Sequence, residues 1–116
     1  MEYNLFWLRR ASNELDEIYQ FYGELASEQV ARRRIGKIIE AVNHLQTTPC
    51  LGRKDEEFEH IRAYRYLIVL TYKVYYFIEG DTVFVASIWD CRQGGSAFYE
   101  WIMNCDLIVG RLSREA

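Results

Sequence analysis

The chain has 116 residues, 50% of them hydrophobic and 16% aromatic, and carries a formal net charge of −3 at pH 7. This length and this apolar content predict a single globular domain and exclude a disordered chain. The acidic balance argues against a protein that relies on general phosphate contacts, because such proteins are usually basic. Binding to nucleic acid would therefore have to be local, or be made together with a larger partner.

Three cysteines, Cys50, Cys91 and Cys105, form no Cys-x-x-Cys pair, and no histidine lies at metal-ligand spacing from them. This pattern favours neither a disulfide framework nor a zinc site, and it fits a reducing compartment. The sequence shows no signal-peptide pattern and no apolar run of the ~20 residues that span a bilayer. We therefore expect a cytoplasmic protein without a metal or other cofactor.

The first predicted elements are a strand and a helix. Residues 3–8 place apolar side chains on both faces of a short strand. Apolar residues then recur at spacings of three and four from Leu15 to Leu25, as on one side of an amphipathic helix. Ser12 precedes this stripe and is predicted as the helix N-cap, because its hydroxyl can accept a hydrogen bond from a free backbone N–H.

A second amphipathic helix is predicted from its N-cap, Ser27, to Leu45. Gly36 lies inside it and indicates a close crossing of two helices, since glycine otherwise weakens a helix. Pro49 ends the helical region. The polar residues 49–63 exceed the usual length of a connection, which favours a loop that has a function, is mobile or is partly structured.

Three consecutive strands are predicted next. They cover residues 65–69, 72–78 and 83–93. Gly80 and Asp81 have the composition of a two-residue hairpin turn, whereas the first hairpin, at Thr71, is inferred from the alternation around it. The last strand is apolar on both faces and is therefore expected inside the sheet. The predicted fold is α+β, a small antiparallel sheet with two helices on one face, in the order β-α-α-β-β-β.

The end of the chain continues this domain. A glycine pair at positions 94–95 breaks the strand pattern, and residues 97–105 are expected to form a short C-terminal helix. We assign residues 1–93 to the main body of the domain and residues 94–116 to an extension of it. Its apolar side chains, Trp101 among them, are candidates for contact with a partner protein or with a second copy of the chain.

Several short motifs follow one another in order along residues 3–93. They are Ala11 with Glu14, Leu15, Glu17, Ile18 and Tyr22; Pro49 with Gly52 and Arg53; Arg65 with Leu67; Tyr72 with Tyr76; and Ile88 with Asp90, Arg92 and Gln93. Together with the order of the predicted elements, these motifs resemble the RelE/ParE family of small bacterial toxins. The proline and the glycine–arginine pair after the second helix are similar to those of ParE-type members.

The resemblance implies the toxin of a type II toxin–antitoxin pair, of the kind that stabilises plasmids. In this family a small antitoxin wraps over the toxin and silences it. RelE-like members enter the ribosome and cut mRNA, whereas ParE-like members poison DNA gyrase without known hydrolytic chemistry. The implied partners are a cognate antitoxin and either gyrase or the ribosome with its mRNA, and a homodimer is a further expectation.

Cleavage of mRNA would require a base for the ribose 2′-hydroxyl, an acid for the leaving oxygen and cations around the phosphorus. By resemblance, the residues that would supply this chemistry are Lys54, Lys73, Arg92 and Tyr99. Lys73 stands where RelE-like enzymes have an arginine, and lysine does not clamp phosphate in the bidentate manner of arginine. Acidic residues 55–57 also follow Lys54 directly and would repel RNA.

We therefore favour a ParE-like inhibitor of gyrase over a RelE-like endonuclease, with an inactive interaction protein of the same fold as the third hypothesis. The side chains predicted to bind a partner are Arg53, Arg62, Arg65, Tyr75, Asp90 and Trp101. Structural roles compete with this prediction. Arg65 lies among strand-core residues, and Asp90 has the spacing to form a salt bridge with Arg92 at the end of the sheet.

The basic run at residues 32–34 is the other conspicuous charge pattern. Three consecutive residues span most of a helical turn, so these arginines cannot share one face of the helix. A solvated helix surface paired with Glu28 or Glu40 is therefore favoured over a nucleic-acid site.

Overall fold

The computed structural model of the chain describes residues 2–91. The expected helix at residues 97–105, the glycine pair before it, and the candidates Arg92, Tyr99 and Trp101 lie outside the described residues. The described elements, in chain order, are β1 (Asn4–Trp7), α1 (Arg9–Leu25), α2 (Glu28–Asn43), the 3-10 turn η1 (His44–Gln46), β2 (Arg53–Lys54), the 3-10 turn η2 (Glu56–Phe58), β3 (Arg65–Val69), β4 (Tyr72–Glu79) and β5 (Thr82–Asp90).

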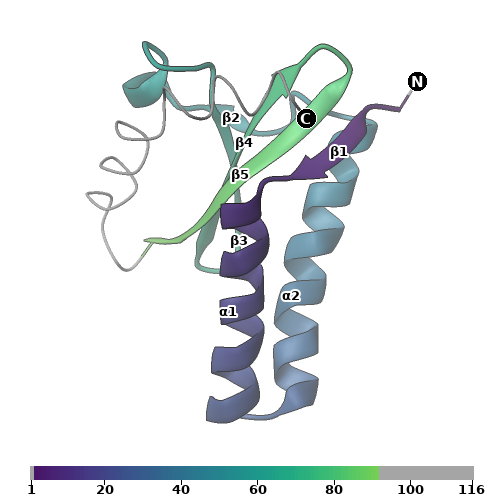
Figure 1. Cartoon of the computed structure of the whole chain (residues 1–116), viewed down its shortest axis with the longest axis vertical. Coiled ribbons are helices and arrows are strands. Elements are labelled where there is room, and N and C mark those ends of the chain that lie inside the picture. The colour runs from purple at the N-terminus through teal and green to yellow at the C-terminus, as the bar shows by residue number, and fades with distance from the viewer. Residues whose placement is uncertain (1, 92–116) are drawn as a thin grey trace.

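A single sheet has the strand order β1-β5-β4-β3-β2 (Figure 1). Its neighbours from β2 to β5 are antiparallel, as predicted, and both helices pack on one face of it. The predicted α+β fold and its order of elements are therefore confirmed. Two details differ from the prediction: β1 runs parallel to β5, so the sheet is mixed, and the long polar loop contains the short strand β2.

Helix α1 begins earlier than the sequence pattern suggests. Leu8 is its N-cap and offers no side-chain hydrogen bond, so the prediction of Ser12 as the cap is wrong. The backbone N–H of Leu8 donates to the Val85 carbonyl of β5, and its side chain is buried. Pairing with β5 therefore holds the chain to the sheet as far as Leu8, and the helix begins at the next residue.

Helix α2 begins where predicted, because the Ser27 hydroxyl accepts a hydrogen bond of 3.1 Å from the backbone N–H of Val30. The predicted close crossing at Gly36 is wrong. Gly36 is exposed, and a side chain added there would meet nothing within 4 Å. The small residues in the core between helices and sheet are instead Ala11 and Ala31, which are both fully buried.

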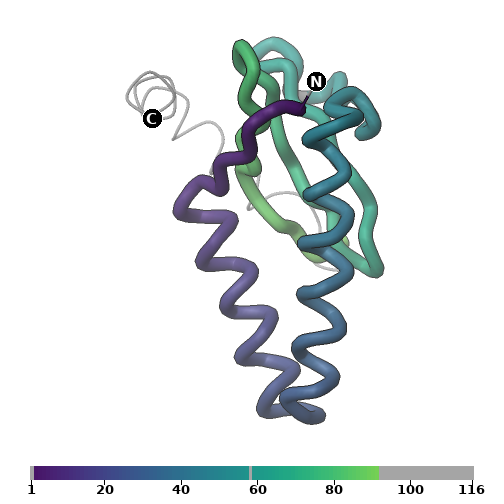
Figure 2. The backbone as a smooth tube through the Cα atoms, turned by 90° about the vertical axis from the view of Figure 1, so that its right-hand side faces the viewer, coloured from purple at the N-terminus to yellow at the C-terminus, as the bar shows by residue number. Residues whose placement is uncertain are grey.

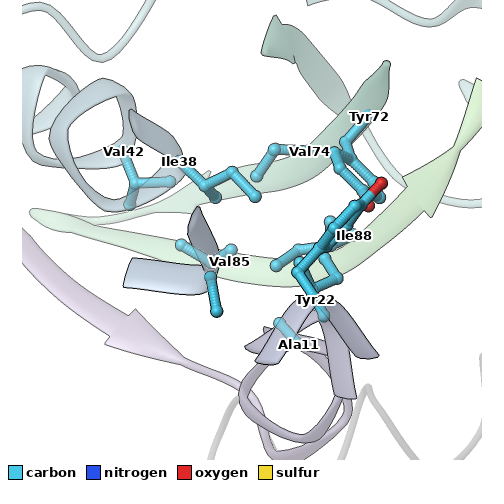
Figure 3. Close-up of a cluster of buried hydrophobic side chains, with 10 residues drawn as sticks. Ala11, Tyr22, Ile38, Val42, Tyr72, Val74, Val85 and Ile88 are labelled. Carbon is cyan, nitrogen blue, oxygen red and sulfur yellow. The ribbon is translucent and has the colours of Figure 1, made fainter. Parts of the chain in front are cut away.

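The helices bury a largely aliphatic core against the sheet. In Figure 3, Ala11 and Tyr22 of α1 and Ile38 and Val42 of α2 lie around side chains of β4 and β5. The strand residues of this cluster are Tyr72, Val74, Val85 and Ile88. Because side chains alternate along a strand, the intervening residues of β4 and β5 point to the opposite face.

Both hairpins of the three-strand unit are two residues long. Gly80 has a left-handed backbone with φ of 62°, which glycine adopts without strain, and the predicted turn at Gly80 and Asp81 is confirmed. The hairpin inferred around Thr71 is confirmed as well. Its left-handed position, with φ of 58°, is occupied by Leu70, which explains why no turn signal marks it in the sequence.

The helical hairpin is longer than the sheet that it covers. The connection between α1 and α2 lies beyond the end of the sheet, so the C-terminal part of α1 and the N-terminal part of α2 project from the molecule (Figures 1 and 2). Neither helix, nor any other within residues 2–91, combines the length and apolar character needed to cross a membrane.

Candidate functional site

The face of the sheet opposite α1 and α2, called the distal face here, is lined mainly by aromatic side chains. Its buried residues are Leu8, Tyr64, Tyr75, Phe77, Phe84 and Ala86, and the partly buried Ile61, Tyr66 and Trp89 pack against them. The Phe77 and Phe84 rings are stacked with centroids 5.1 Å apart, and Tyr64 meets Phe77 edge-to-face at 5.7 Å. Such offset and edge contacts make a rigid aromatic surface.

Two of the predicted binding or catalytic cations contact this aromatic surface. The Lys73 Nζ atom lies 4.7 Å from the centre of the Tyr66 ring, and the Arg62 guanidinium lies 4.2 Å from the centre of the Phe77 ring. Arg62 also forms an ion pair of 3.7 Å with Glu79. Each cation is therefore oriented by an aromatic face, which attracts positive charge through its quadrupole.

Strand register places Arg53 on the distal face and Lys54 on the other side of the sheet. Arg53 pairs with Tyr66, which pairs with Tyr75 of the distal cluster. Directly paired residues share a face, so Arg53 lies on the same face as these tyrosines. Lys54 pairs with Arg65, which pairs with Tyr76, and Tyr76 belongs to a core cluster on the helix side.

The two lysines of the predicted catalytic set are consequently far apart. Lys73 pairs with Ile68, three residues along β3 from Arg65, the partner of Lys54. Three residues span about 10 Å along a strand, and the two lysines also lie two strands apart, about 10 Å across the sheet. The structure therefore places Lys73, Arg53 and Arg62 on the same face of the sheet and Lys54 on the other face.

Arg65 anchors the chain that precedes β2. Its Nη1 atom donates hydrogen bonds to the carbonyl oxygens of Gly52, at 2.8 Å, and Cys50, at 3.3 Å. These bonds hold the loop at residues 49–53 against β3. Of the two roles considered for Arg65, the geometry favours the structural one.

Tyr75 and Tyr72 are buried tyrosines at opposite faces of β4. Burial, followed by the neighbouring carboxylate of Asp55, raises the pKa of Tyr75 well above its usual value of 10. Burial, followed by a hydrogen bond with Tyr22, raises the pKa of Tyr72 to about 12. Both hydroxyls therefore stay protonated at physiological pH and act as neutral hydrogen-bonding groups. Asp90 pairs with Tyr72 at the end of β5 and adds to this shift.

A family model described as the ParE toxin of type II toxin-antitoxin system, parDE, matches residues 5–94. The chain belongs to the ParE toxin family. The match runs from β1 through β5, so it covers both faces of the sheet and both helices. The resemblance to the ParE branch is thereby confirmed.

A chain from the structure titled "Chromosomal ParDE TA system from P. aeruginosa" has a similar fold. The TM-score is 0.66 and the sequence identity is 23%, over 77% of this chain and 96% of that chain. At this identity the likeness concerns the fold. Comparison with curated proteins gives no match.

The structure gives a physical reason for the glycine–arginine pair that this ParE family chain carries after α2. The backbone N–H of Gly52 donates to the Tyr76 hydroxyl at 2.8 Å, and that hydroxyl donates to the Pro49 carbonyl at 2.7 Å. A Cβ atom at position 52 would lie 2.6 Å from the Tyr76 oxygen and 2.8 Å from the Tyr66 carbonyl oxygen. Glycine is therefore required for the approach that sets Arg53 on the distal face.

Glu14 has a structural role that the sequence reasoning misses. Its Oε1 atom accepts hydrogen bonds from the Ser87 hydroxyl at 2.9 Å and the backbone N–H of Ile88 at 3.0 Å. The Nε atom of Arg10 forms an ion pair with the other oxygen of Glu14, Oε2, at 3.4 Å. The spacing of Glu14 could have indicated this role. Glu14 stands three residues after Ala11 and therefore lies near the buried side of α1.

A bulge in β5 and the end of β1 both lie beside this carboxylate. Tyr75 pairs with Ser87 and Tyr76 with Val85, so Ala86 has no partner of its own in β4. Strand β1 ends at Trp7, opposite Val85, and the rest of β5 therefore faces α1. Glu14 satisfies the backbone there in place of a strand. Burial raises the pKa of Glu14 above its usual value of 4.5, although the hydrogen bonds from Ile88 and Ser87 oppose the shift.

Proposed function

We propose that this ParE family chain is a growth-inhibiting toxin that acts by binding DNA gyrase and is neutralised by a cognate antitoxin. Membership of the ParE toxin family supports the toxin role. The observation that carries the choice of binding over cleavage is the separation of Lys54 from Lys73 across the sheet. A general acid and base must both reach the reacting atoms, so residues on opposite faces do not form one catalytic site.

The distal face has the composition of a protein-binding surface. Energetically important interface residues are enriched in tyrosine, tryptophan and arginine, and their cores are rigid and well packed. Tyr66 and Trp89 are partly exposed at the border of the buried aromatic cluster, and the exposed Arg53 pairs with Tyr66. Ile68, 60% exposed, pairs with Lys73 and adds an apolar contact on the same face. We assign this face to the antitoxin, which would cover it with an extended or helical segment.

Inducible expression in a bacterial host tests the toxin role and its target. Chromosome integrity and total RNA are sampled within minutes of growth arrest, and purified chain is assayed for inhibition of DNA supercoiling by gyrase. The proposal predicts double-strand breaks, inhibited supercoiling and intact mRNA. Codon-positioned mRNA cuts would instead establish the ribosome-dependent endonuclease, and unimpaired growth with soluble protein would establish the inactive interaction protein.

A pair of lysine variants tests the distal face separately. Lys73→Glu reverses a charge on the distal face, and Lys54→Glu makes the same change on the other side of the sheet. We expect Lys73→Glu to weaken co-purification with the cognate antitoxin at least tenfold and Lys54→Glu to leave it within twofold. Equal effects of the two substitutions would contradict the assignment of the antitoxin to the distal face.

A further inference from the structure

A second surface of the chain lies where α2 passes the tip of the β3–β4 hairpin. A hollow of about 210 Å³ is lined there by Val30, Arg33, Arg34, Lys37 and Leu70. Val30 and Leu70 provide apolar surface, and the three other side chains are cations. The hollow is on the helix side of the sheet, so it is distinct from the distal face.

The positive charge of the hollow is not compensated by the described part of the chain. Arg33 and Lys37 are four residues apart on α2, a spacing at which like charges repel. Within residues 2–91 no ion pair includes Arg33, Arg34 or Lys37, whereas the neighbouring Arg32 pairs with Glu28 at 2.8 Å. The predicted pairing of the basic run with Glu28 is thus confirmed for Arg32, which does not line the hollow.

Arg34 has a defined orientation at this hollow. Its guanidinium lies 4.2 Å from the centre of the Tyr22 ring of α1, a contact that holds the cation without neutralising it. The arginine therefore keeps its hydrogen-bond donors and its charge for an external group. Arginine is well suited to binding a carboxylate, because its planar donors match the two oxygens.

Leu70 is an unusual residue for its position. Its backbone is left-handed, with φ of 58°, where a side chain with a Cβ atom is strained and glycine or asparagine is preferred. Its side chain is nevertheless 41% exposed, so it gains only part of the burial that would offset the strain. An exposed leucine in a strained turn beside uncompensated cations indicates a contact made outside this chain.

We propose that this hollow binds an acidic segment of the toxin's protein target, with an apolar side chain against Leu70 and Val30 and carboxylates on Arg33, Arg34 and Lys37. The carboxylates of such a segment are complementary to the three cations of the hollow. The apolar surface of Val30 and Leu70 is too small to bind a purely hydrophobic segment. The hollow and the distal face point in different directions, so an antitoxin on the distal face would leave the hollow to another protein. This inference rests on the proposed toxin role but not on gyrase as the target.

Charge reversal tests the cationic part. The double substitution Arg33→Glu with Lys37→Glu is compared with Arg9→Glu with Arg32→Glu, which changes the net charge equally at exposed sites outside the hollow. We expect the first variant to lose growth inhibition at least tenfold, measured as survival after induction, while the control arrests growth like the wild type. Both are expected to co-purify with the cognate antitoxin.

Leu70→Asn separates function from folding. Asparagine tolerates the left-handed backbone, so the thermal unfolding temperature should stay the same or rise, whereas the loss of the apolar side chain should reduce growth inhibition at least threefold. Full toxicity of the Arg33/Lys37 double variant and of Leu70→Asn would overturn the inference. It would also be overturned if these variants lost antitoxin binding but stayed toxic, or if they lost binding to RNA or DNA but kept their binding to protein.

The test of gyrase as the target is independent of the test of the hollow. If the wild-type chain arrests growth but does not bind gyrase, gyrase is the wrong target. The role of the hollow in toxicity is then still tested by the variants described above. If the wild-type chain does not arrest growth, both the proposed function and this inference are wrong.

Discussion

The helix side of the sheet is lined mostly by aliphatic residues, whereas the distal face is lined mostly by aromatic rings with cations at its edge. The two surfaces come from the same strands, because alternate residues of β4 and β5 point to opposite sides. Aliphatic side chains from α1 and α2 fill the helix side and stabilise the fold. The partly exposed aromatic and cationic side chains of the distal face can also contact a partner, so we propose this face for the antitoxin and the hollow beside α2 for the target.

The largest expected effect on stability lies in the helix-side core. Ile38→Ala removes a fully buried side chain of α2 and should lower the free energy of unfolding by about 2–5 kcal/mol, since a cavity adds to the lost burial. Ile39→Ala, at the next and only half-buried position, is the matched control. Urea unfolding followed by circular dichroism measures both, and equal losses would contradict the core described for α2.

The glycines of α2 and of the loop after it should respond in opposite directions. Gly52→Ala forces a methyl group against Tyr76 and should destabilise the chain by about 1–3 kcal/mol. Gly36→Ala adds a methyl group in open space on an exposed helix and should stabilise it by about 0.5–1 kcal/mol. Chemical unfolding of the two variants checks the signs, and stabilisation by Gly52→Ala would refute the close approach to Tyr76.

Glu14 should make stability depend on pH. Its pKa in the folded chain is above the usual 4.5, so the folded state binds the proton more tightly than the unfolded state does. The associated stability is present below about pH 4.5 and is lost as the pH rises through the folded pKa. Glu14→Gln keeps an oxygen for Ser87 and Ile88 but cannot ionise. The stability of the variant minus that of the wild type should therefore increase between pH 4 and pH 8, and a decrease would contradict the burial effect.

The smallest expected effect is that of Lys73 on stability. Lys73→Ala removes the contact with the Tyr66 ring and should cost about 0.5–1 kcal/mol, whereas Lys54→Ala, at an exposed site, should cost less than about 0.5 kcal/mol. Thermal unfolding of both variants measures this difference. A cost above 2 kcal/mol for Lys73→Ala would place this lysine in the stability core and weaken its assignment to a binding surface.

The fold was predictable where local signals are strong. Ser27 can cap a helix from its own sequence context, and Gly80 supplies the left-handed backbone of a tight turn. Ser12 misled the prediction because the start of α1 is set by pairing of Leu8 with Val85, a residue distant in sequence. Leu70 gave no signal, since its residue type does not favour the backbone that it adopts.

The candidate site was predictable in composition but not in arrangement. Arg53, Arg62 and Lys73 could be identified as cations near the predicted strands. Whether Arg53 or Lys54 shares a face with Lys73 depends on register, and a shift of one residue exchanges the two faces. The two-residue strand β2 is too short to carry an alternation pattern that would set this register in the sequence.

The sequence by itself determined both helices, four of the five strands, their order and the family, because hydrophobic periodicity and short motifs are local properties of the chain. Only the tertiary structure decided that β1 is parallel to β5, that Glu14 satisfies the backbone beside the β5 bulge, and that Leu70 meets the cations of α2. Each of these joins residues far apart along the chain. Such contacts are fixed by packing and by the need to satisfy buried polar groups, which no local pattern encodes.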